Sequence, residues 1–171
     1  MARRQSDAEF TEFVHAAWPA LYRTAYLLVG DTGLAEDLVQ TALAKTYASW
    51  GKLRELRAAR AYARTTLVNT ASSWFRRKGW RNERPTERLR EAAYDEDPSV
   101  RPALMQALAQ LPPRQRAVIV LRFYDDLSVA DTARALSCAE GTVKSQTSDA
   151  LSSLRALLGE TVVPLDSGAH S

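Results

Sequence analysis

The chain has 171 residues, of which 46% are apolar and 25% are charged, and these values are ordinary for a soluble globular protein. Its one cysteine, Cys138, excludes an internal disulfide and a zinc site built from cysteines. No apolar run reaches the ~18 residues that a membrane span needs, and the polar start of the chain has no signal-peptide pattern. We therefore expect a cytoplasmic protein that has no membrane partner.

The net charge of +3 is distributed unevenly along the chain. Residues 51–90 hold twelve basic and three acidic side chains, whereas the segments before and after them are net negative. Trp74, Phe75 and Trp80 are interleaved with this basic block. Cations neutralise phosphates and aromatic rings stack on bases, so this mixture predicts the main nucleic-acid contact in the middle of the chain. The alternative is a charged helix face that contacts only solvent.

The first half of the chain predicts three amphipathic helices. Apolar residues recur at helical spacing from Ser6 to about Leu28, from Leu34 to about Trp50 and from Arg60 to about Lys78. Pro19 lies inside the first segment and is expected to kink or divide it, because proline has no amide hydrogen to donate. A short basic loop, Gly51–Ala59, precedes the third helix. We predict a first domain of three helices over residues 6–79.

The second half predicts a helix-turn-helix motif after a linker. Segment 80–98 changes from basic to acidic and lacks an apolar stripe, so we interpret it as a flexible linker. The helices expected after it run from Ser99 to Gln110, from Arg114 to Tyr124, from Val129 to Leu136 and from Glu140 to Leu158. Ser128 and Asp131 form a capping box before the third of these helices. The predicted fold is all-α, with a second domain over 99–158 and a disordered tail over 159–171.

The sequence offers little catalytic or metal-binding chemistry. The two histidines, His15 and His170, have no partner at metal-ligand spacing, and the seven glycines form no phosphate-binding loop. The acidic groups Asp125–Asp126 and Asp95–Asp97 are interpreted as solvated residues of a turn and of the linker. We therefore expect no enzymatic activity, no metal site and no cofactor. A nuclease or recombinase that carries a helix-turn-helix is the disfavoured alternative.

Four segments in this order resemble motifs of the extracytoplasmic-function (ECF) group of bacterial RNA polymerase sigma factors. They are Asp37–Thr41, Ala59–Lys78, Leu111–Val118 and Gly141–Ser145. The resemblance covers about Phe10 to Leu158, and the particular residues of the motifs are similar to those of an actinobacterial subgroup. It implies a region 2-like first domain that binds core polymerase and melts the −10 promoter element. It also implies a region 4-like second domain that binds the −35 element.

The resemblance implies roles for residues of the first domain. It assigns the contact with core RNA polymerase to Asp37, Leu38, Gln40 and Thr41. It assigns contacts with the −10 region to Arg57, Arg60, Arg64, Asn69, Arg76 and Arg77. In the family a flipped base lies between the loop before the third helix and that helix, which are Gly51–Ala59 and the start of Arg60–Lys78 here. The amide of Asn69 can hydrogen-bond a base edge, and the alternative for it is an exposed helix asparagine.

For the second domain, the resemblance implies contacts with the −35 region. The residues assigned to them are Arg122, Gly141, Thr142, Lys144, Ser145 and Ser148. For Ser148 a solvated serine is an equal alternative. Two residues depart from the family pattern, because Asp149 stands where a basic residue is common and Ala139 stands where a capping serine or threonine is common. A carboxylate at Asp149 repels phosphate or accepts from a cytosine amino group.

The implied function is promoter recognition and DNA melting together with core RNA polymerase. The alternative is an autonomous helix-turn-helix regulator, which binds DNA without polymerase and usually dimerises on paired half-sites. The sequence has no obvious dimerisation helix, and its main basic surface lies outside the helix-turn-helix, so the sigma factor is favoured. Its implied partners are core RNA polymerase, promoter DNA and an anti-sigma factor, since members of the group are often held by one.

Overall fold

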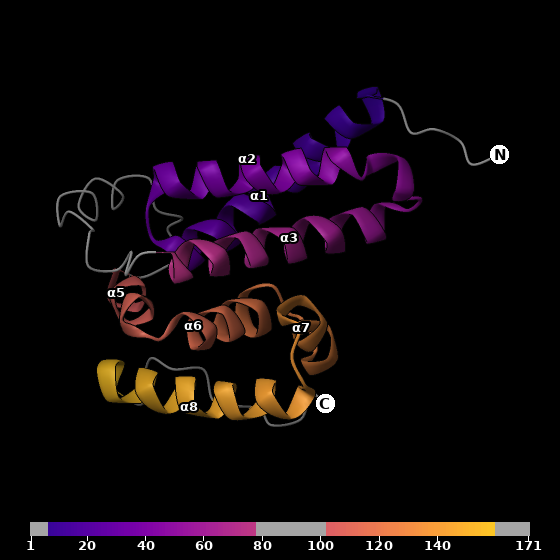
Figure 1. Cartoon of the computed structure of the whole chain (residues 1–171). Helices are drawn as coiled ribbons and strands as arrows, with labels where there is room; N and C mark the ends of the chain where they lie inside the picture. The colour runs from indigo at the N-terminus through magenta and orange to yellow at the C-terminus, as the bar shows by residue number, and fades with distance from the viewer. Residues whose placement is uncertain (1–6, 78–101, 160–171) are drawn as a thin grey trace.

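The structure is a computed structural model, and it describes residues 7–77 and 102–159 (Figure 1). All regular structure in these two ranges is helical, as the sequence predicts. The first range folds into α1 (Asp7–Val29), α2 (Thr32–Ala48), the short 3-10 helix η1 (Trp50–Lys52) and α3 (Leu56–Arg76). The second range folds into α5 (Pro102–Gln110), α6 (Pro113–Ile119), the π-helical turn η4 (Val120–Tyr124), α7 (Val129–Leu136) and α8 (Glu140–Leu158).

Helix α1 passes through Pro19 without a break, so the predicted division of this helix is wrong. Pro19 is exposed, and the chain buries Phe13, Ala17 and Leu21 on the opposite side of the helix. This apolar stripe packs on α2 and α3, and tertiary packing therefore outweighs the local cost of proline. Beyond Leu21 the pattern changes, because every residue from 24 to 30 is buried.

Two helices begin earlier than the sequence analysis predicts. Helix α2 begins at Thr32, because the carboxylate of Asp31 caps it and accepts from the Leu34 amide at 2.9 Å. Helix α3 begins at Leu56, where the Ala59 amide already donates to the Glu55 carbonyl at 3.0 Å. The basic loop predicted over Gly51–Ala59 is therefore largely wrong. It consists of the end of the 3-10 helix, three non-helical residues and the first turn of α3.

The helix-turn-helix is present with the predicted boundaries of its last two helices. The Ser128 hydroxyl accepts from the Asp131 amide at 3.0 Å, which confirms the cap of α7. Helix α8 begins after Ala139, whose side chain provides no cap. The helix predicted over Arg114–Tyr124 is α6 continued by η4, and π-turns of this kind are rare and frequently mark functional positions.

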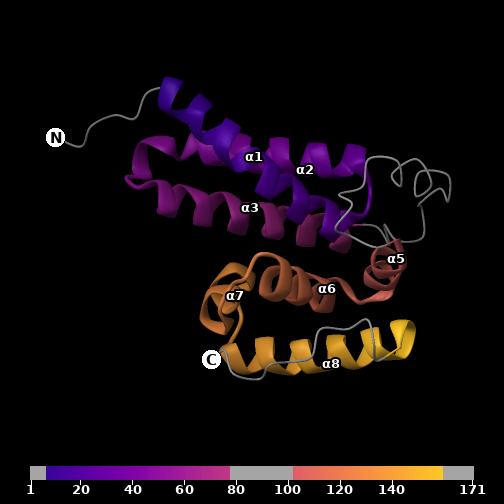
Figure 2. The same cartoon turned by 180° about the vertical axis from the view of Figure 1, so that it is seen from behind.

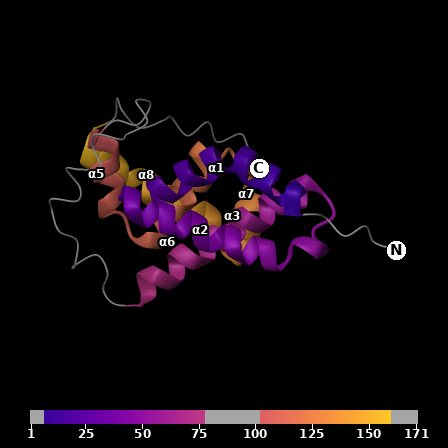
Figure 3. The ribbon, with the colours of Figure 1, turned by 90° about the horizontal axis from the view of Figure 1, so that it is seen from above.

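The two sets of helices form two stacked layers, with α1, α2 and α3 above α5, α6, α7 and α8 (Figures 1 and 2). Seen from above, the first layer covers α6 and α8 (Figure 3). Helix α3 contacts α6 and α7, and the end of α1 contacts η4, so one hydrophobic core runs through both layers. Two helical domains are confirmed, but their close packing on each other was not predicted.

The segments expected to be a linker (80–98) and a tail (160–171) lie outside the described residues. Among the helices that the structure does describe, none has the length and apolar character needed to cross a membrane.

Candidate nucleic-acid interface

The outer face of α2 carries three of the four residues expected to contact polymerase. Asp37 and Gln40 are exposed, and the half-buried Thr41 donates its hydroxyl to the Asp37 carbonyl at 2.8 Å. Leu38 is fully buried, because α2 turns its apolar stripe towards α1 and α3. Leu38 therefore holds α2 in place, and a partner protein can reach only the other three side chains.

Helix α3 divides the residues expected to contact the −10 element between two faces. At about 100° per residue, Arg57, Arg60 and Arg64 fall on one face, and Asn69 and Arg76 fall about a third of a turn away. The first face points towards the second domain, where Arg60 and Arg64 line a cavity shared with α1 and with the residue after η4. The second face is exposed, so the predicted set is not one continuous surface.

A groove of about 450 Å³ lies along the second face, between α2 and α3. It is lined by Thr41, Lys45, Thr66, Asn69, Thr70, Ser73, Trp74 and Arg77. The ammonium group of Lys45 donates to the Thr70 hydroxyl at 3.1 Å and so joins the two helices across the groove. An exposed amide, a half-buried indole and an exposed guanidinium thus meet in one concave place. An unstacked nucleotide can contact these three groups through the edge of its base, the face of its ring and its phosphate, respectively.

The structure does not bring the predicted base-binding loop to Asn69. About thirteen residues of α3 separate Leu56 from Asn69, and at ~1.5 Å per residue this is roughly 20 Å along the helix. The loop lies at the beginning of α3, whereas the groove lies near its end. One flipped base cannot contact both places, and the groove is the one that contains the amide.

The exposed face of α8 carries the residues expected to contact the −35 element. Lys144, Ser145 and Ser148 are exposed, and the opposite face buries Val143, Ala150 and Leu154 in the core. A Cβ added at Gly141 would meet nothing within 4 Å, so this position is open to a close approach of DNA. The half-buried Thr142 completes the first turn.

The N-terminus of α8 has backbone amides without a side-chain cap. Ala139 makes no capping hydrogen bond, so these amides remain available at the positive end of the helix dipole. A DNA phosphate is a suitable acceptor for them. Asp149 is exposed on α8, as Ser145 is. Its carboxylate is therefore accessible, and both predicted effects, repulsion of a phosphate and acceptance of a hydrogen bond from a cytosine amino group, stay predictions.

Arg122 differs from the other predicted −35 residues because it is held within its own domain. Its Nη1 donates to the Leu127 carbonyl at 2.7 Å, across the turn that connects η4 to α7. This bond fixes the turn of the helix-turn-helix. A structural role for Arg122 is therefore present in the protein without DNA.

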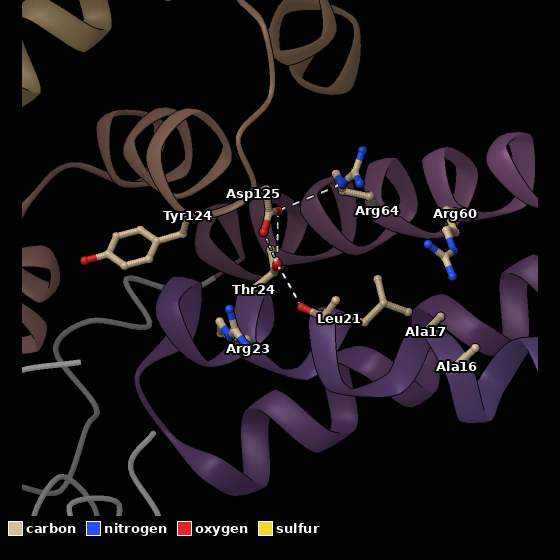
Figure 4. A pocket seen from close by; sticks show the side chains of 10 residues that line it. Ala16, Ala17, Leu21, Arg23, Thr24, Arg60, Arg64, Tyr124 and Asp125 are labelled. Carbon is tan, nitrogen blue, oxygen red and sulfur yellow. Dashed lines mark hydrogen bonds and ion pairs between the residues drawn. The ribbon is translucent and has the colours of Figure 1, made fainter. Parts of the chain in front are cut away.

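The cavity between the two layers contains a group of polar residues that the sequence analysis missed. It has a volume of about 250 Å³ and is lined by residues of α1, by Arg60 and Arg64 of α3, and by Tyr124 and Asp125 (Figure 4). The hydroxyl of Thr24 lies 2.8 and 3.0 Å from the two carboxylate oxygens of Asp125. Arg64 Nε lies 3.9 Å from the same carboxylate.

The Asp125 carboxylate is therefore not the solvated turn residue that was predicted. Burial raises its pKa, whereas the hydrogen bond from Thr24 and the charges of Arg64 and Arg23 lower it, and the net direction is upward. Neighbouring Asp126, which is exposed, also raises this pKa. Burial likewise raises the pKa of the Tyr124 phenol at the same interface.

A second polar contact joins the layers at the end of α1. Arg116 of α6 is only 3% exposed, and its Nε donates to the Leu27 carbonyl at 2.6 Å. The last carbonyls of a helix lack an intrahelical partner, and a cation is favourable there because of the helix dipole. Arg116 thus caps α1 from the other domain.

The sequence did contain a signal for this interface, which is the apolar run Ala25–Val29. A helix that is apolar on all sides is buried on all sides, so this run indicates a second covering layer.

Across the described residues, no group of three or more potential metal ligands is present.

Comparisons with known proteins match both halves of the chain. Residues 13–81 match the family model described as sigma-70 region 2, and residues 101–154 match the one described as sigma-70, region 4. The RNA polymerase sigma-E factor of Streptomyces coelicolor is 43% identical over 86% of this chain and 84% of its own length. The ECF RNA polymerase sigma factor SigL of Mycobacterium tuberculosis is 35% identical over 85% of each chain.

A solved structure has a similar fold. It is the sigma factor RpoE of Bartonella quintana in complex with the anti-sigma factor NepR. The two chains share 28% identity and a TM-score of 0.67, over 88% of this chain and 96% of the other. With both domains and relatives along most of its length identified, this chain belongs to the ECF group of bacterial RNA polymerase sigma factors.

Proposed function

We propose that three surfaces of this sigma factor divide the work of initiation. The residues on the outer face of α2, which are the exposed Asp37 and Gln40 and the half-buried Thr41, bind core RNA polymerase. The groove beside Asn69 holds an unstacked base of the −10 element, and the exposed face of α8 lies in the major groove at the −35 element. The two domains, 6–79 and 99–158, thus carry different recognition tasks.

The observation that carries this proposal is the groove between α2 and α3. Asn69, Trp74 and Arg77 line this groove together, although their positions in the sequence do not fall on one face of the helix. Unstacking a base costs a few kcal/mol, and a site that offers stacking, an edge contact and a cation recovers that cost. The groove also adjoins Thr41, so it lies next to the proposed polymerase surface.

Sigma factor action of this kind needs no covalent chemistry. The protein supplies sequence preference and a base-binding site, and the polymerase supplies catalysis. We infer that the chain works in the cytoplasm, where polymerase and promoter DNA are. We also propose an anti-sigma factor as a regulatory partner, supported by the RpoE relative, whose structure was solved with NepR.

Replacing Asn69 tests the base-binding role. We expect Asn69→Ala to reduce the rate of open-complex formation about tenfold or more, because losing one edge contact costs ~1–3 kcal/mol. Core binding, measured by competition with a labelled sigma factor, should remain unchanged. Permanganate reactivity of unpaired thymines with core polymerase and promoter DNA measures the first quantity.

The matched control is Gln106→Ala, which removes an exposed amide from α5 of the second domain, a residue that does not line the groove. It should change neither quantity. Equal loss of core binding and melting in Asn69→Ala would show that Asn69 supports the domain and does not read a base.

A further inference from the structure

The cavity between the two layers carries more positive than negative charge. Arg23 of α1 lines it together with Arg60 and Arg64 of α3 (Figure 4). Among its lining residues in the described part of the chain, Asp125 supplies the one carboxylate, and Arg64 Nε lies 3.9 Å from it. Three positive charges thus face one negative charge. The surfaces proposed above for polymerase and promoter DNA use none of these four residues.

The spacing of the arginines on α3 is unfavourable without an anion. Arg60 and Arg64 are four residues apart, so their side chains leave the helix on the same face. Arg57, three residues before Arg60, adds another positive charge to that face, and like charges at this spacing destabilise a helix. Neither Arg57 nor Arg60 has a hydrogen bond or an ion pair with another residue that the structure describes. An anion beside Arg60 would relieve this repulsion.

Helix α1 leaves room for such an anion, because the residues that it places opposite the arginines are small. Ala16, Ala17 and Ala20 line the cavity, and Ala17 lies opposite the side chain of Arg60 (Figure 4). The cavity has a volume of about 250 Å³, which is the space of about eight water molecules at ~30 Å³ each. A phosphate or diphosphate group fits this space, whereas a nucleic-acid strand with its sugars and bases does not.

A second hollow beside the cavity has room for an organic group attached to the phosphate. Its volume is about 660 Å³, and it shares Arg60 and Arg64 with the cavity, so the two spaces adjoin at these side chains. Most of its other lining residues are apolar or aromatic. They are Leu53, Ala58, Ala61, Tyr62, Leu127 and Ala135. Apolar walls with a few charged groups are typical of sites that bind small molecules.

We propose that this cavity binds the phosphate or diphosphate group of a small phosphorylated molecule, held by Arg23, Arg60 and Arg64. A guanidinium suits this role because it stays charged and donates two parallel hydrogen bonds to phosphate oxygens. These bonds are stronger in a partly enclosed cavity than in water, since the effective dielectric constant is lower there. The proposal does not rest on the proposed function, because the residues assigned to polymerase and promoter binding do not line the cavity.

Calorimetric titration of the full-length protein with inorganic pyrophosphate, at constant ionic strength, tests the site. Wild type should bind one pyrophosphate per chain. Arg60→Gln should weaken this binding about tenfold or more, because a charge-assisted contact with the anion is lost. The matched control is Arg76→Gln, which removes an exposed arginine of the same helix that does not line the cavity. This control should bind pyrophosphate as wild type does.

Asp125 gives a test in the opposite direction, because its carboxylate repels an anion in the cavity. Asp125→Asn removes this charge but keeps an oxygen that can accept from the Thr24 hydroxyl. The affinity for pyrophosphate should therefore rise about tenfold. Asp126→Asn makes the same change at an exposed neighbour that does not line the cavity, and it should change the affinity less than about twofold.

Filling the cavity tests the site without a change of charge. Ala20→Leu places a larger side chain in the cavity and should abolish pyrophosphate binding, whereas Ala8→Leu makes the same change at an exposed residue of α1 outside it. Helical content by circular dichroism checks that each variant is folded.

Three results would overturn the proposal. The first is a wild type that binds no pyrophosphate at ~10 mM. The second is equal affinity in Arg60→Gln and Arg76→Gln. The third is displacement of pyrophosphate by a single-stranded oligonucleotide at equal phosphate concentration, because the arginines would then form a nucleic-acid surface. None of these measurements uses polymerase, so failure here leaves the proposed function intact.

Discussion

At the scale of single residues, the informative positions are polar side chains buried where the two domains meet. Thr24 is 3% exposed, and its hydroxyl lies 2.8 Å from a carboxylate oxygen of the other domain and 3.0 Å from the Ala20 carbonyl of its own helix, two acceptors that share its one proton. Arg116 is equally buried, and its Nε donates a hydrogen bond to the Leu27 carbonyl of α1. Buried polar groups need partners, so each such residue ties the position of one domain to the other.

Arg116 should be sensitive even to a conservative change. Arg116→Lys keeps the charge but loses the planar guanidinium that reaches Leu27, and it leaves a buried cation poorly paired. We expect the free energy of unfolding to fall by about 2 kcal/mol, measured by urea denaturation. Arg114→Lys, an exposed neighbour on α6, should change it by less than ~0.5 kcal/mol. Equal effects of the two substitutions would contradict the capping role.

Acidity should stabilise the packing of the second domain on the first through Asp125. The pKa of Asp125 is raised, so this carboxyl binds the proton more strongly when the domains are packed than when they are apart, where the pKa returns towards its ordinary value of 3.8. The packed arrangement therefore gains stability as the pH falls through the raised pKa, and loses it as the pH rises through it.

We expect the radius of gyration of the free chain to shrink as the pH is lowered through the raised pKa of Asp125. Asp125→Asn removes the titrating group and should flatten this response. A response of the same size in Asp125→Asn would assign the effect to other carboxylates.

At the scale of elements, the helices themselves were predictable but the faces they present were not. The spacing of apolar residues located the helix-turn-helix, and Ser128 fixed the start of α7 because a capping hydroxyl acts locally. The start of α3 was placed too late, since an alanine-rich first turn has no apolar stripe to mark it. The basic residues of α3 read as one DNA surface in the sequence, whereas the helix divides them between two faces.

The contribution of α8 to promoter affinity can be measured by its salt dependence. Lys144→Ala should lower the slope of log affinity against log salt by about one for polymerase holoenzyme on promoter DNA, because one phosphate contact is lost. Arg155→Ala removes an exposed cation about three turns further along α8 and should leave the slope unchanged. An unchanged slope in Lys144→Ala would remove this residue from the DNA interface.

At the scale of the whole molecule, family motifs and composition predicted two helical domains but not their contact. The residues that make the contact are separated by about a hundred positions in the chain, as with Thr24 and Asp125. Local periodicity cannot report which distant surfaces meet. The apolar run Ala25–Val29 indicated a covering layer without indicating its identity. The same separation explains why Asp125 was interpreted as a solvated turn residue.

We expect this chain to initiate transcription only together with core polymerase. Run-off transcription with purified core enzyme on a library of promoter fragments tests that claim most directly. We predict defined start sites with core plus this protein, and none with core alone. We also predict that Asn69→Ala lowers the yield more than Gln106→Ala. The absence of specific starts, together with a footprint on paired half-sites by the protein alone, would contradict the sigma-factor function and favour an autonomous regulator.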